Sequence, residues 1–589
     1  MKLRLIALLA LIVTTPSLAS PQDLALRALG DEMDRSLEQL RLGDEPRPYF
    51  LSYRLDDLEV MEIGASFGSP LRRSLDRSRV LSAELRVGTA QRDNTNFFSM
   101  GGAGSGITRA WNGSLNVPIE DDYRELRRHA WLLTDGTYKT ALENLARKTA
   151  ALSSRRIPGD LPDFTPVAPA TVQEVLETAR VDPGEAEGIV SSISSVFRQQ
   201  PAVDHSVARL RVVRQNSRYL NSEGSSFVRS VPLVELSFTA VTQAADGTRL
   251  ADAVAHYGHS IGDLPPLEEL IDEATQLGAR LASATDGAEI ERYNGPVLFS
   301  GQAAAEVFHQ IFAPGLAAWR PPIAEDERLE RRLTQMGAAL NDRLGGRVLA
   351  RSMRLVDDPR ADMESDVRLY GGYDVDDEGV PSSRTILAER GILKALVASR
   401  NPASGVTATT GNRRGSIALP SNLLLSTSEG RSEEELLEEL RLLLDERELD
   451  FGVVVRRIAN PRLLASFEPR GSGARSGGDG AVGGVVEAFK VFRDGRRELL
   501  RDPRFSGFTA ASFRDIVAAS TARTVYSAPM RPEHAGVALL SSGTLGSTLA
   551  GPAVVSVVVP DLLFEELTIA LSTEAVPRTP VIPHPYFAE

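Results

Sequence analysis

The sequence contains no cysteine among its 589 residues. This absence excludes disulfide bonds, thiolate metal ligands, a cysteine nucleophile and a lipid anchor attached through cysteine. Beyond its first 20 positions the sequence has no run of about 18 apolar residues, so it offers no candidate for a membrane-spanning helix. No Gly-x-Ser-x-Gly motif lies between a predicted strand and a predicted helix, which excludes the nucleophile elbow of the α/β-hydrolases.

Basic residues are in the minority, because 66 lysines and arginines stand against 79 acidic residues and give a formal net charge of −13. The acidic excess is spread along the chain, which argues against a nucleic-acid surface, since phosphates require a basic face. Hydrophobic residues make up 42% of the chain and charged residues 25%, as in soluble globular proteins. A chain of this length exceeds what one hydrophobic core supports, so we expect two or more domains.

The N-terminus has the pattern of an export signal. Lys2 and Arg4 are followed by the nine-residue apolar run Leu5–Val13, which is too short to span a bilayer. Ser17 and Ala19 supply small residues at the −3 and −1 positions of a cleavage site. The sequence therefore predicts a signal peptide over residues 1–19, cleaved near Ala19, and a periplasmic or secreted protein.

Apolar periodicity predicts alternating helical and extended regions in the first half of the chain. Asp246-Gly247 is a strong turn signal and joins two alternating runs into a hairpin. Four prolines over 157–169 indicate an extended connector. Helices are expected over 23–42, 120–153, 171–198 (interrupted near Pro183-Gly184) and 267–281, with short strands between 48 and 117, of which 81–90 is the clearest.

The second half is expected to be mostly β. Turn signals at Arg390-Gly391 and Asp494-Gly495 predict two hairpins, and the β-branched run Val554–Val559 predicts a buried strand. Ser432 begins a capping box with Glu435 and therefore predicts the start of a helix. We place the domain boundary at about residue 290, which divides the mature chain into domains over 20–290 and 291–589.

The stretch Tyr293–Leu316 has the layout of a metal-binding strand–turn–helix, with the helix starting at Ala303. Glu306 and His309 are three residues apart on that helix and share a face. A zinc site needs three or four converging ligands, and no third ligand follows nearby. Local packing of His309 is the favoured interpretation, and a metal site that recruits other groups stays open.

His256 and His259 form the other close histidine pair. On a strand, side chains three residues apart lie on opposite faces, whereas at a turn they could converge. A surface turn is favoured over a metal site. The acidic cluster 374–378 lacks the spacing of a calcium loop and is predicted to be a solvated turn. Arg413 and Arg414 could bind a peptide carboxylate through their planar forks or could be exposed turn charges; both alternatives stay open.

Together with Tyr293–Leu316, five segments resemble, in the same order, signatures of the TldD/PmbA metallopeptidase family, and they span the chain from about Val207 to its C-terminus. In active members the helix reads His-Glu-x-x-x-His, and a distant cysteine is a further zinc ligand. Alignment on Glu306 places Ala305 and Gln310 at the two histidine positions, so the zinc motif is degenerate. The five segments are RVVRQNSRYLNSEGSSFVRS (211–230), YDVDDEGVPSSRTILAERGILKALVASR (373–400), TGNRRGSIALPSNLLL (410–425), VVEAFKVFRDGRRELL (485–500) and VVVPDLLFEELTI (557–569).

The resemblance implies an α+β protein of two domains, with a curved sheet and helices in the N-terminal half and a β-rich C-terminal half. It also implies dimers with a peptide channel inside, in which some active subunits pair with a sister lacking zinc ligands. We predict an exported, zinc-less family member that binds peptide segments or completes a partner's channel, as a homodimer or as a heterodimer with an intact member. No cofactor is expected.

Two alternatives stay open at this point. The first is an active metallopeptidase that degrades unstructured peptides with relocated zinc ligands. Glu306 would be its catalytic residue, and His309, His256 and His259 would be candidate ligands. The second is a structural protein of the cell envelope that keeps only the fold. Whether the chain is an enzyme is therefore undecided from the sequence, although the missing ligands predict inactivity for the chain alone.

Overall fold

A computed structural model of the protein describes residues 23–98, 113–153, 155, 161–177, 180–335, 339–464, 482, 484–530, 553–570 and 582. The predicted signal peptide (1–19) and the glycine-rich stretch 471–480 lie outside the described residues. Within these ranges no helix is both long enough and apolar enough to span a membrane.

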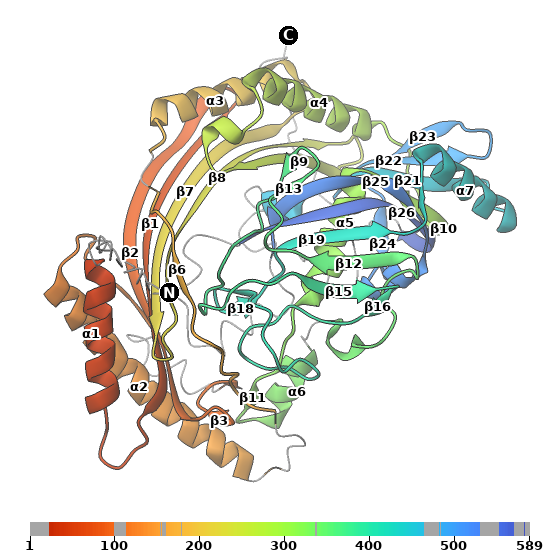
Figure 1. The fold of residues 1–589 in the computed structure, drawn as a ribbon. Coiled ribbons are helices and arrows are strands. Elements are labelled where there is room, and N and C mark those ends of the chain that lie inside the picture. The colour runs from red at the N-terminus through yellow and green to blue at the C-terminus, as the bar shows by residue number, and fades with distance from the viewer. Residues whose placement is uncertain are drawn as a thin grey trace, which may run out of the picture.

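The N-terminal half is a tall curved sheet that arches around one side of the molecule (Figure 1). Its strand order is β3-β2-β1-β7-β8-β6, with β5 paired to β2 and β9 paired to β8. β1 and β2 form a long antiparallel hairpin that turns at Phe67 and Gly68, both of which have a positive φ. The elements are α1 Leu24–Gln39, β1 Pro48–Ser66, β2 Ser69–Thr89, β3 Arg92–Asp93, β4 Phe97–Phe98, β5 Ser114–Asn116, α2 Tyr123–Ser153, β6 Thr171–Gln173, α3 Pro183–Ser195, β7 His205–Asn221, β8 Ser226–Gln243, β9 Arg249–Gly258 and α4 Leu267–Thr285.

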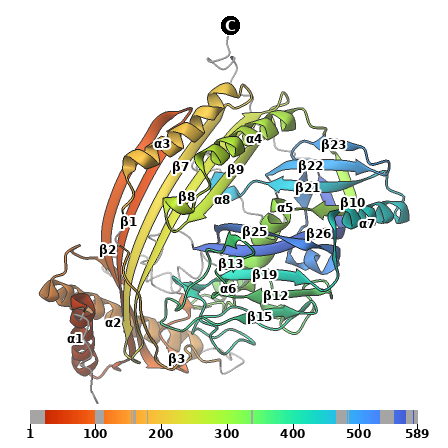
Figure 2. The same ribbon diagram turned by 45° about the horizontal axis from the view of Figure 1, so that its top comes forward.

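The two faces of this sheet differ in polarity because side chains alternate along each strand. On the convex face, α1 and α2 cover the lower part and α3 and α4 the upper part (Figure 2). Leu55 and Leu81 pack in the lower core, and Leu236 packs in the upper one. The concave face carries polar residues such as Arg54 and Arg229 and lies toward the C-terminal half. The apolar face therefore holds the arch together, while the polar face is left for contacts with the other half.

The C-terminal half contains a twelve-stranded mixed sheet, in which β26 lies between β19 and β10. β26 pairs parallel with β19 and antiparallel with β10 and β25. The elements are β10 Arg292–Phe299, α5 Gln302–Val307, β11 Ile323–Ala324, α6 Glu327–Gln335, β12 Met353–Asp357, β13 Met363–Glu364, β14 Val367–Arg368, β15 Thr385–Glu389, β16 Ile392–Leu393, β17 Arg413–Arg414, β18 Ile417–Ala418, β19 Asn422–Thr427, β20 Gly430–Arg431, α7 Glu433–Glu446, β21 Phe451–Ile458, α8 Pro461–Leu464, β22 Val485–Phe492, β23 Arg497–Leu500, β24 Arg504–Ser506, β25 Ile516–Pro529 and β26 Val554–Ala570.

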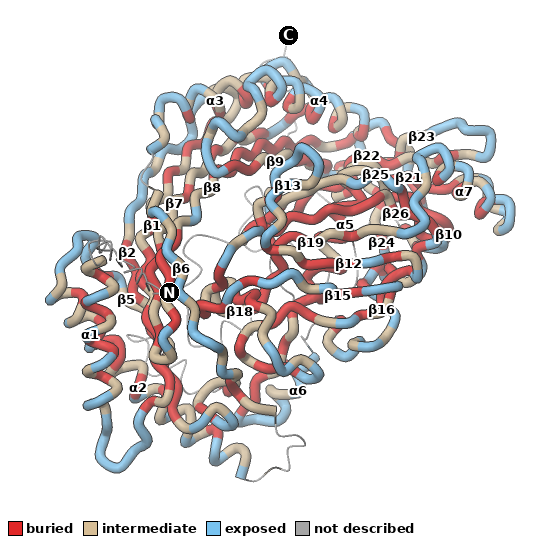
Figure 3. Tube along the Cα trace, viewed as in Figure 1, coloured by how far each residue is buried: buried red, intermediate tan, exposed pale blue. Residues whose placement is uncertain are grey.

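This sheet is buried on both faces, and neighbouring residues of β10 show the division. Leu298 packs under α7 with Leu436 and Leu440, whereas Phe299 belongs to the core on the other side, where its ring packs with those of Phe505 and Phe508. Buried residues follow the strands of this sheet, and the outer surface of α7 is exposed (Figure 3). The α5 side holds the larger core.

The segment after residue 160 joins the two halves along an extended path. The Phe164 ring lies between two guanidinium groups, with Arg86 at 3.8 Å and Arg400 at 3.9 Å from the ring centroid. Arg86 also donates from Nη2 to Asn401 Oδ1 at 2.8 Å. Because Arg86 belongs to the curved sheet and Arg400 to the C-terminal half, this stack fastens one half to the other.

The α+β class and the division into a curved N-terminal sheet and a β-rich C-terminal half are confirmed. The boundary at about residue 290 stays a prediction. The expected helix over 171–198 is wrong for the described residues 171–177 and 180–182: Thr171–Gln173 pairs with β8 as a strand, and helix α3 begins at Pro183, where proline suits a first turn. The short strands expected after Pro48 are instead two long ones, β1 and β2.

Candidate functional site

The strand–turn–helix predicted at Tyr293–Leu316 is present. β10 ends at Phe299, and Gly301 turns the chain with φ of 56°, in the region that favours glycine. The Gly301 N–H donates to Asp561 Oδ1 at 2.7 Å. Helix α5 then runs only to Val307 and continues as one π-helical turn over Phe308–Phe312. This turn sets the direction of the side chains that follow Glu306.

Glu306 is completely buried and is held by neutral hydrogen-bond donors. Its Oε1 accepts from Gln310 Nε2 at 2.6 Å and from Asn460 Nδ2 at 3.0 Å, and Oε2 accepts from Gln302 Nε2 at 3.4 Å. The Tyr526 phenol also hydrogen-bonds the carboxylate. Burial raises the pKa of Glu306 to about 7 despite these donors. The glutamate therefore lies in a closed network of amides and a phenol.

His309 lies in the π-helical turn and is buried. Its Nε2 lies 3.3 Å from the carbonyl oxygen of Ala528, and its ring stands edge-on to Tyr526 with the ring centroids 5.9 Å apart. Burial lowers the pKa of His309 to about 4, so the ring is neutral at physiological pH. Between described residues, no hydrogen bond joins His309 to Glu306.

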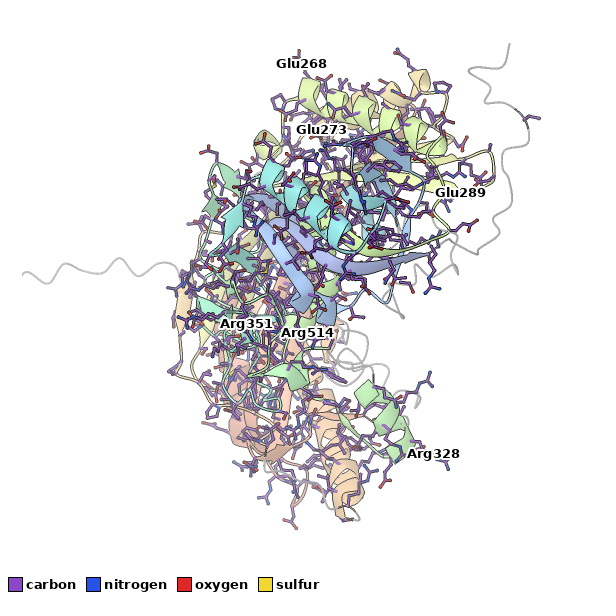
Figure 4. The ribbon with its side chains drawn as sticks, turned by 90° about the vertical axis from the view of Figure 1, so that its right-hand side faces the viewer. Glu268, Glu273, Glu289, Arg328, Arg351 and Arg514 are labelled. Carbon is purple, nitrogen blue, oxygen red and sulfur yellow. The ribbon has the colours of Figure 1, made fainter. Side chains whose placement is uncertain are left out.

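His256 and His259 do not converge. His256 Nε2 lies 2.6 Å from Glu273 Oε2 on α4, the helix on which Glu273 is labelled in Figure 4. His259 follows β9 and stands edge-on to the Tyr370 ring, with the centroids 5.5 Å apart. Burial, and next the charge of Arg368, hold the pKa of His259 below its usual value. The two histidines therefore contact different residues, Glu273 and Tyr370, and do not form one site.

The residues around Glu306 do not fit a zinc ion. Ala305 has no donor atom, and Gln310 directs its amide N–H at Glu306. Amide and phenol hydrogens approach the carboxylate where a metal would have to be, and an amide nitrogen is not a zinc ligand. Over the described part of the chain, no three histidine, aspartate or glutamate side chains are grouped so as to hold a metal ion.

A cavity of about 670 Å³ lies between the concave sheet and the C-terminal half. Val213, Val231 and Leu233 line it from the sheet, and Tyr370 and Ile417 line it from the other side. Four arginines and four carboxylates also reach its wall, so the cavity is neither generally basic nor generally acidic: these are Arg54, Arg229, Arg360, Arg414, Glu174, Asp362, Asp374 and Asp377.

The structure separates the two arginines that the sequence left undecided. Arg413 is buried, donates from Nε to the carbonyl of Gly415 at 2.7 Å and pairs with Glu378 at 3.2 Å. Arg414 lines the large cavity and stacks on the Tyr373 ring at 4.6 Å. Burial lowers the pKa of Arg414.

The acidic cluster 374–378 is only partly a solvated turn. Asp374 is exposed, whereas Asp376 and Glu378 are buried and the Asp377 side chain is 9% exposed, so the prediction is wrong for these three. Burial, and then the charge of Glu378, raise the pKa of Asp376 to about 7.

Asp377 pairs with two arginines of the concave sheet. Arg54 Nη1 lies 2.7 Å from its Oδ2, and Arg229 pairs with its Oδ1. Burial opposes ionisation, but these two arginines hold the pKa of Asp377 well below its usual range. No local pattern in the sequence predicts these two ion pairs, because both arginines lie more than a hundred positions upstream of Asp377.

Comparison with known proteins supports the same relationship as the sequence signatures. Residues 292–461 match the PmbA/TldA metallopeptidase C-terminal domain. No curated protein matches the sequence.

Solved structures resemble almost the whole chain. A proposed modulator of DNA gyrase from Thermotoga maritima is 15% identical, with a TM-score of 0.55 and coverage of 88% of this chain and 96% of that chain. TldE from Thermococcus kodakarensis is 15% identical, with a TM-score of 0.52 and coverage of 92% and 100%. A second proposed gyrase modulator, from Bacteroides thetaiotaomicron, is 14% identical, with a TM-score of 0.55 and coverage of 93% and 99%. At these identities the likeness shows the fold alone.

Proposed function

The chain belongs to the TldD/PmbA family, and from this membership we propose that it is a zinc-less member that binds extended peptide segments, either for itself or as the partner of an intact subunit. The observation that carries the proposal is the closed network around Glu306. The oxygens of Glu306, which the sequence comparison aligns with the family's glutamate, accept hydrogen bonds from Gln310, Asn460 and Tyr526. A peptidase that relies on zinc has no reaction centre in such an environment.

The cavity supports the peptide-binding part of the proposal. Its volume of about 670 Å³ and its mixed wall suit a short length of peptide, whose side chains and backbone are both apolar and polar. Aliphatic side chains, among them Val213 and Leu233, line the same wall as polar ones such as Gln215 and Ser230.

One strand edge in the cavity has unpaired backbone. In the described residues, β6 pairs with β8 up to Val228 and β9 pairs with it from Val234, so no strand covers 229–233 on that edge. The Ser230 N–H on this edge is taken by Glu174 Oε2 at 3.1 Å, and Pro232 has no N–H. The edge therefore offers carbonyl acceptors, and a peptide added here as a strand would donate its own N–H groups.

Metal analysis and peptide assays on the purified chain without residues 1–19 test the proposal. We expect no stoichiometric zinc, no cleavage of an unstructured peptide and measurable peptide binding. Stoichiometric zinc together with chelator-sensitive cleavage would instead establish the active peptidase with relocated ligands. In that case Glu306→Gln and His309→Ala should both abolish cleavage.

Location and partnership are further parts of the proposal. The charged, apolar and small-residue order of positions 1–19 supports export to the periplasm or the medium.

Partnership can be tested by co-expression. The tagged mature chain should co-purify with a family member that carries the intact motif when the two are co-expressed. A stable homodimer that excludes both peptide and partner would favour a structural role in the envelope.

A further inference from the structure

We propose that Arg414 and Arg229 form a carboxylate-binding position in the cavity wall, which takes the C-terminal carboxylate or an acidic side chain of a bound peptide. The inference rests on the proposed function, because it assigns a chemical preference to the same cavity. Both residues line that cavity, one from the turn at β17 and the other from strand β8 of the concave sheet.

Arg414 has donor capacity that the protein does not use. Among the described residues its guanidinium makes one hydrogen bond, from Nη1 to the carbonyl of Gly371 at 3.1 Å, and it forms no ion pair. Its other face is fixed by the Tyr373 ring. A guanidinium has five N–H donors in a rigid fork that matches a carboxylate, so most of the Arg414 donors are available.

Arg229 contributes an independent observation. Its residue exposure is 7%, and its Nε is buried without a hydrogen-bond partner in the described structure. Nη1 donates to the carbonyl of Val375 at 2.7 Å, and Nη2 is paired with Asp377. A buried N–H without an acceptor is unfavourable, and a ligand oxygen would satisfy it.

The balance of charge around the two residues favours an anion. Asp377 is shared between Arg54 and Arg229, and Arg54 is also bound by Asp56. Arg414 lines the same wall but has no carboxylate paired with it in the described structure; burial, and then the charge of Arg229, lower its pKa. A ligand carboxylate would give Arg414 an ion-pair partner.

Arg413 shows that unused hydrogen-bond donors are not a general property of the arginines in this segment. Arg413 has the same chemistry one position earlier, but Glu378 and the Gly415 carbonyl occupy it. The structure thus distinguishes the arginine that stabilises the fold from the one that remains available to a ligand.

The test compares two unstructured peptides of one sequence, with a free C-terminal carboxylate or a C-terminal amide, by titration calorimetry with the mature protein. A second pair carries a central glutamate or glutamine in amidated peptides and distinguishes a side-chain carboxylate from a terminal one. We expect at least one pair to show tighter binding of the carboxylate form, on the order of tenfold, as for a hydrogen-bonded charge. Arg414→Gln should abolish that ratio while the neutral peptide still binds.

Arg360→Gln is the matched control, because it removes another arginine of the same cavity wall and should leave the ratio intact. If the wild-type protein binds both peptides of each pair equally well, the proposed carboxylate-binding position is wrong, whether or not the variants fold. Loss of the ratio in both variants would also overturn it, since the preference would then follow the general charge. Absence of binding by all four peptides would reject the proposed function and this inference together, whereas binding without preference would reject only the inference.

Discussion

The Gln310 Nε2 atom lies 2.6 Å from Glu306 Oε1, so the side chain that the sequence comparison aligns with the family's second histidine donates a hydrogen bond to the aligned glutamate. Asn460 reaches the same oxygen from the end of the neighbouring strand at 3.0 Å. The site is therefore an ordered polar core in its own right, and its chemistry is that of a buried carboxyl group held by amides.

Replacement of Glu306 by glutamine should change how stability depends on pH. The carboxyl titrates near pH 4.5 in an ordinary environment and near 7 in the fold, because burial disfavours the charged form. Between these values the folded state binds the proton and the unfolded state does not, so stability falls as the pH rises and levels off above about 7. The unfolding free energy of wild type minus that of Glu306→Gln should fall by up to about 3 kcal/mol across this window.

Urea denaturation at a series of pH values measures this difference, because all other titrating groups are shared by the two proteins. Glu446→Gln makes the same substitution at the exposed end of α7 and is the matched control. A constant difference for Glu306→Gln would mean that Glu306 is charged in the fold throughout.

Removal of divalent metal should leave the protein unchanged. The groups around Glu306 present hydrogens instead of lone pairs, so no zinc binding energy is expected to support the fold there. Calorimetric melting with and without a strong chelator should give the same midpoint, and added zinc should not raise it. A chelator-induced decrease that zinc reverses would contradict the account of the site.

Asp377→Asn should be strongly destabilising. Arg54 and Arg229 would keep their buried charges without the carboxylate that pairs them, a change that costs about 3–5 kcal/mol. Limited proteolysis and urea denaturation should both report the loss. Asp374→Asn, on the same turn but exposed, should change stability by less than about 0.5 kcal/mol. Similar effects of the two substitutions would argue against a stabilising role of the ion pairs that Asp377 forms with Arg54 and Arg229.

Phe164→Leu should weaken the attachment of the two halves. The ring lies within 4 Å of two buried guanidinium carbons, and a desolvated cation–π contact is worth about 2 kcal/mol. We expect a loss of about 2–4 kcal/mol, measured by denaturant unfolding. Phe164→Tyr keeps the aromatic ring between the two guanidinium groups, beside a pocket of about 60 Å³ that the ring helps to line, so we expect a smaller loss than for leucine. Equal losses in both variants would assign the effect to packing alone.

Local signals in the sequence were sufficient for many elements. The leucine spacing after residue 23 predicted α1, which spans Leu24–Gln39. The Ser432 capping box is formed in the structure with both of its hydrogen bonds, and the turn at Asp246-Gly247 joins β8 to β9. Each of these depends on residues within a few positions of one another.

Features that depend on distant partners could not be predicted in this way. The strand Thr171–Gln173 exists because β8 offers it an edge, and its own residues do not require a strand. The burial of Asp377 is stable only because Arg54 and Arg229 lie opposite it. Ala305 and Gln310 predict a degenerate zinc motif from the sequence. Asn460 and Tyr526, which complete the network around Glu306, follow more than a hundred positions later, and no local sequence pattern identifies them.

The place of β26 in the C-terminal sheet has a consequence for biosynthesis. In the described structure the strands β12, β15, β16 and β19 are joined to β10, β21, β22 and β23 only through β26, which ends at Ala570. Until β26 is in place, the chain holds two half-sheets with exposed edges and no strand that joins them. Exposed sheet edges promote aggregation, so a truncation that removes β26 should yield aggregates instead of a smaller folded protein.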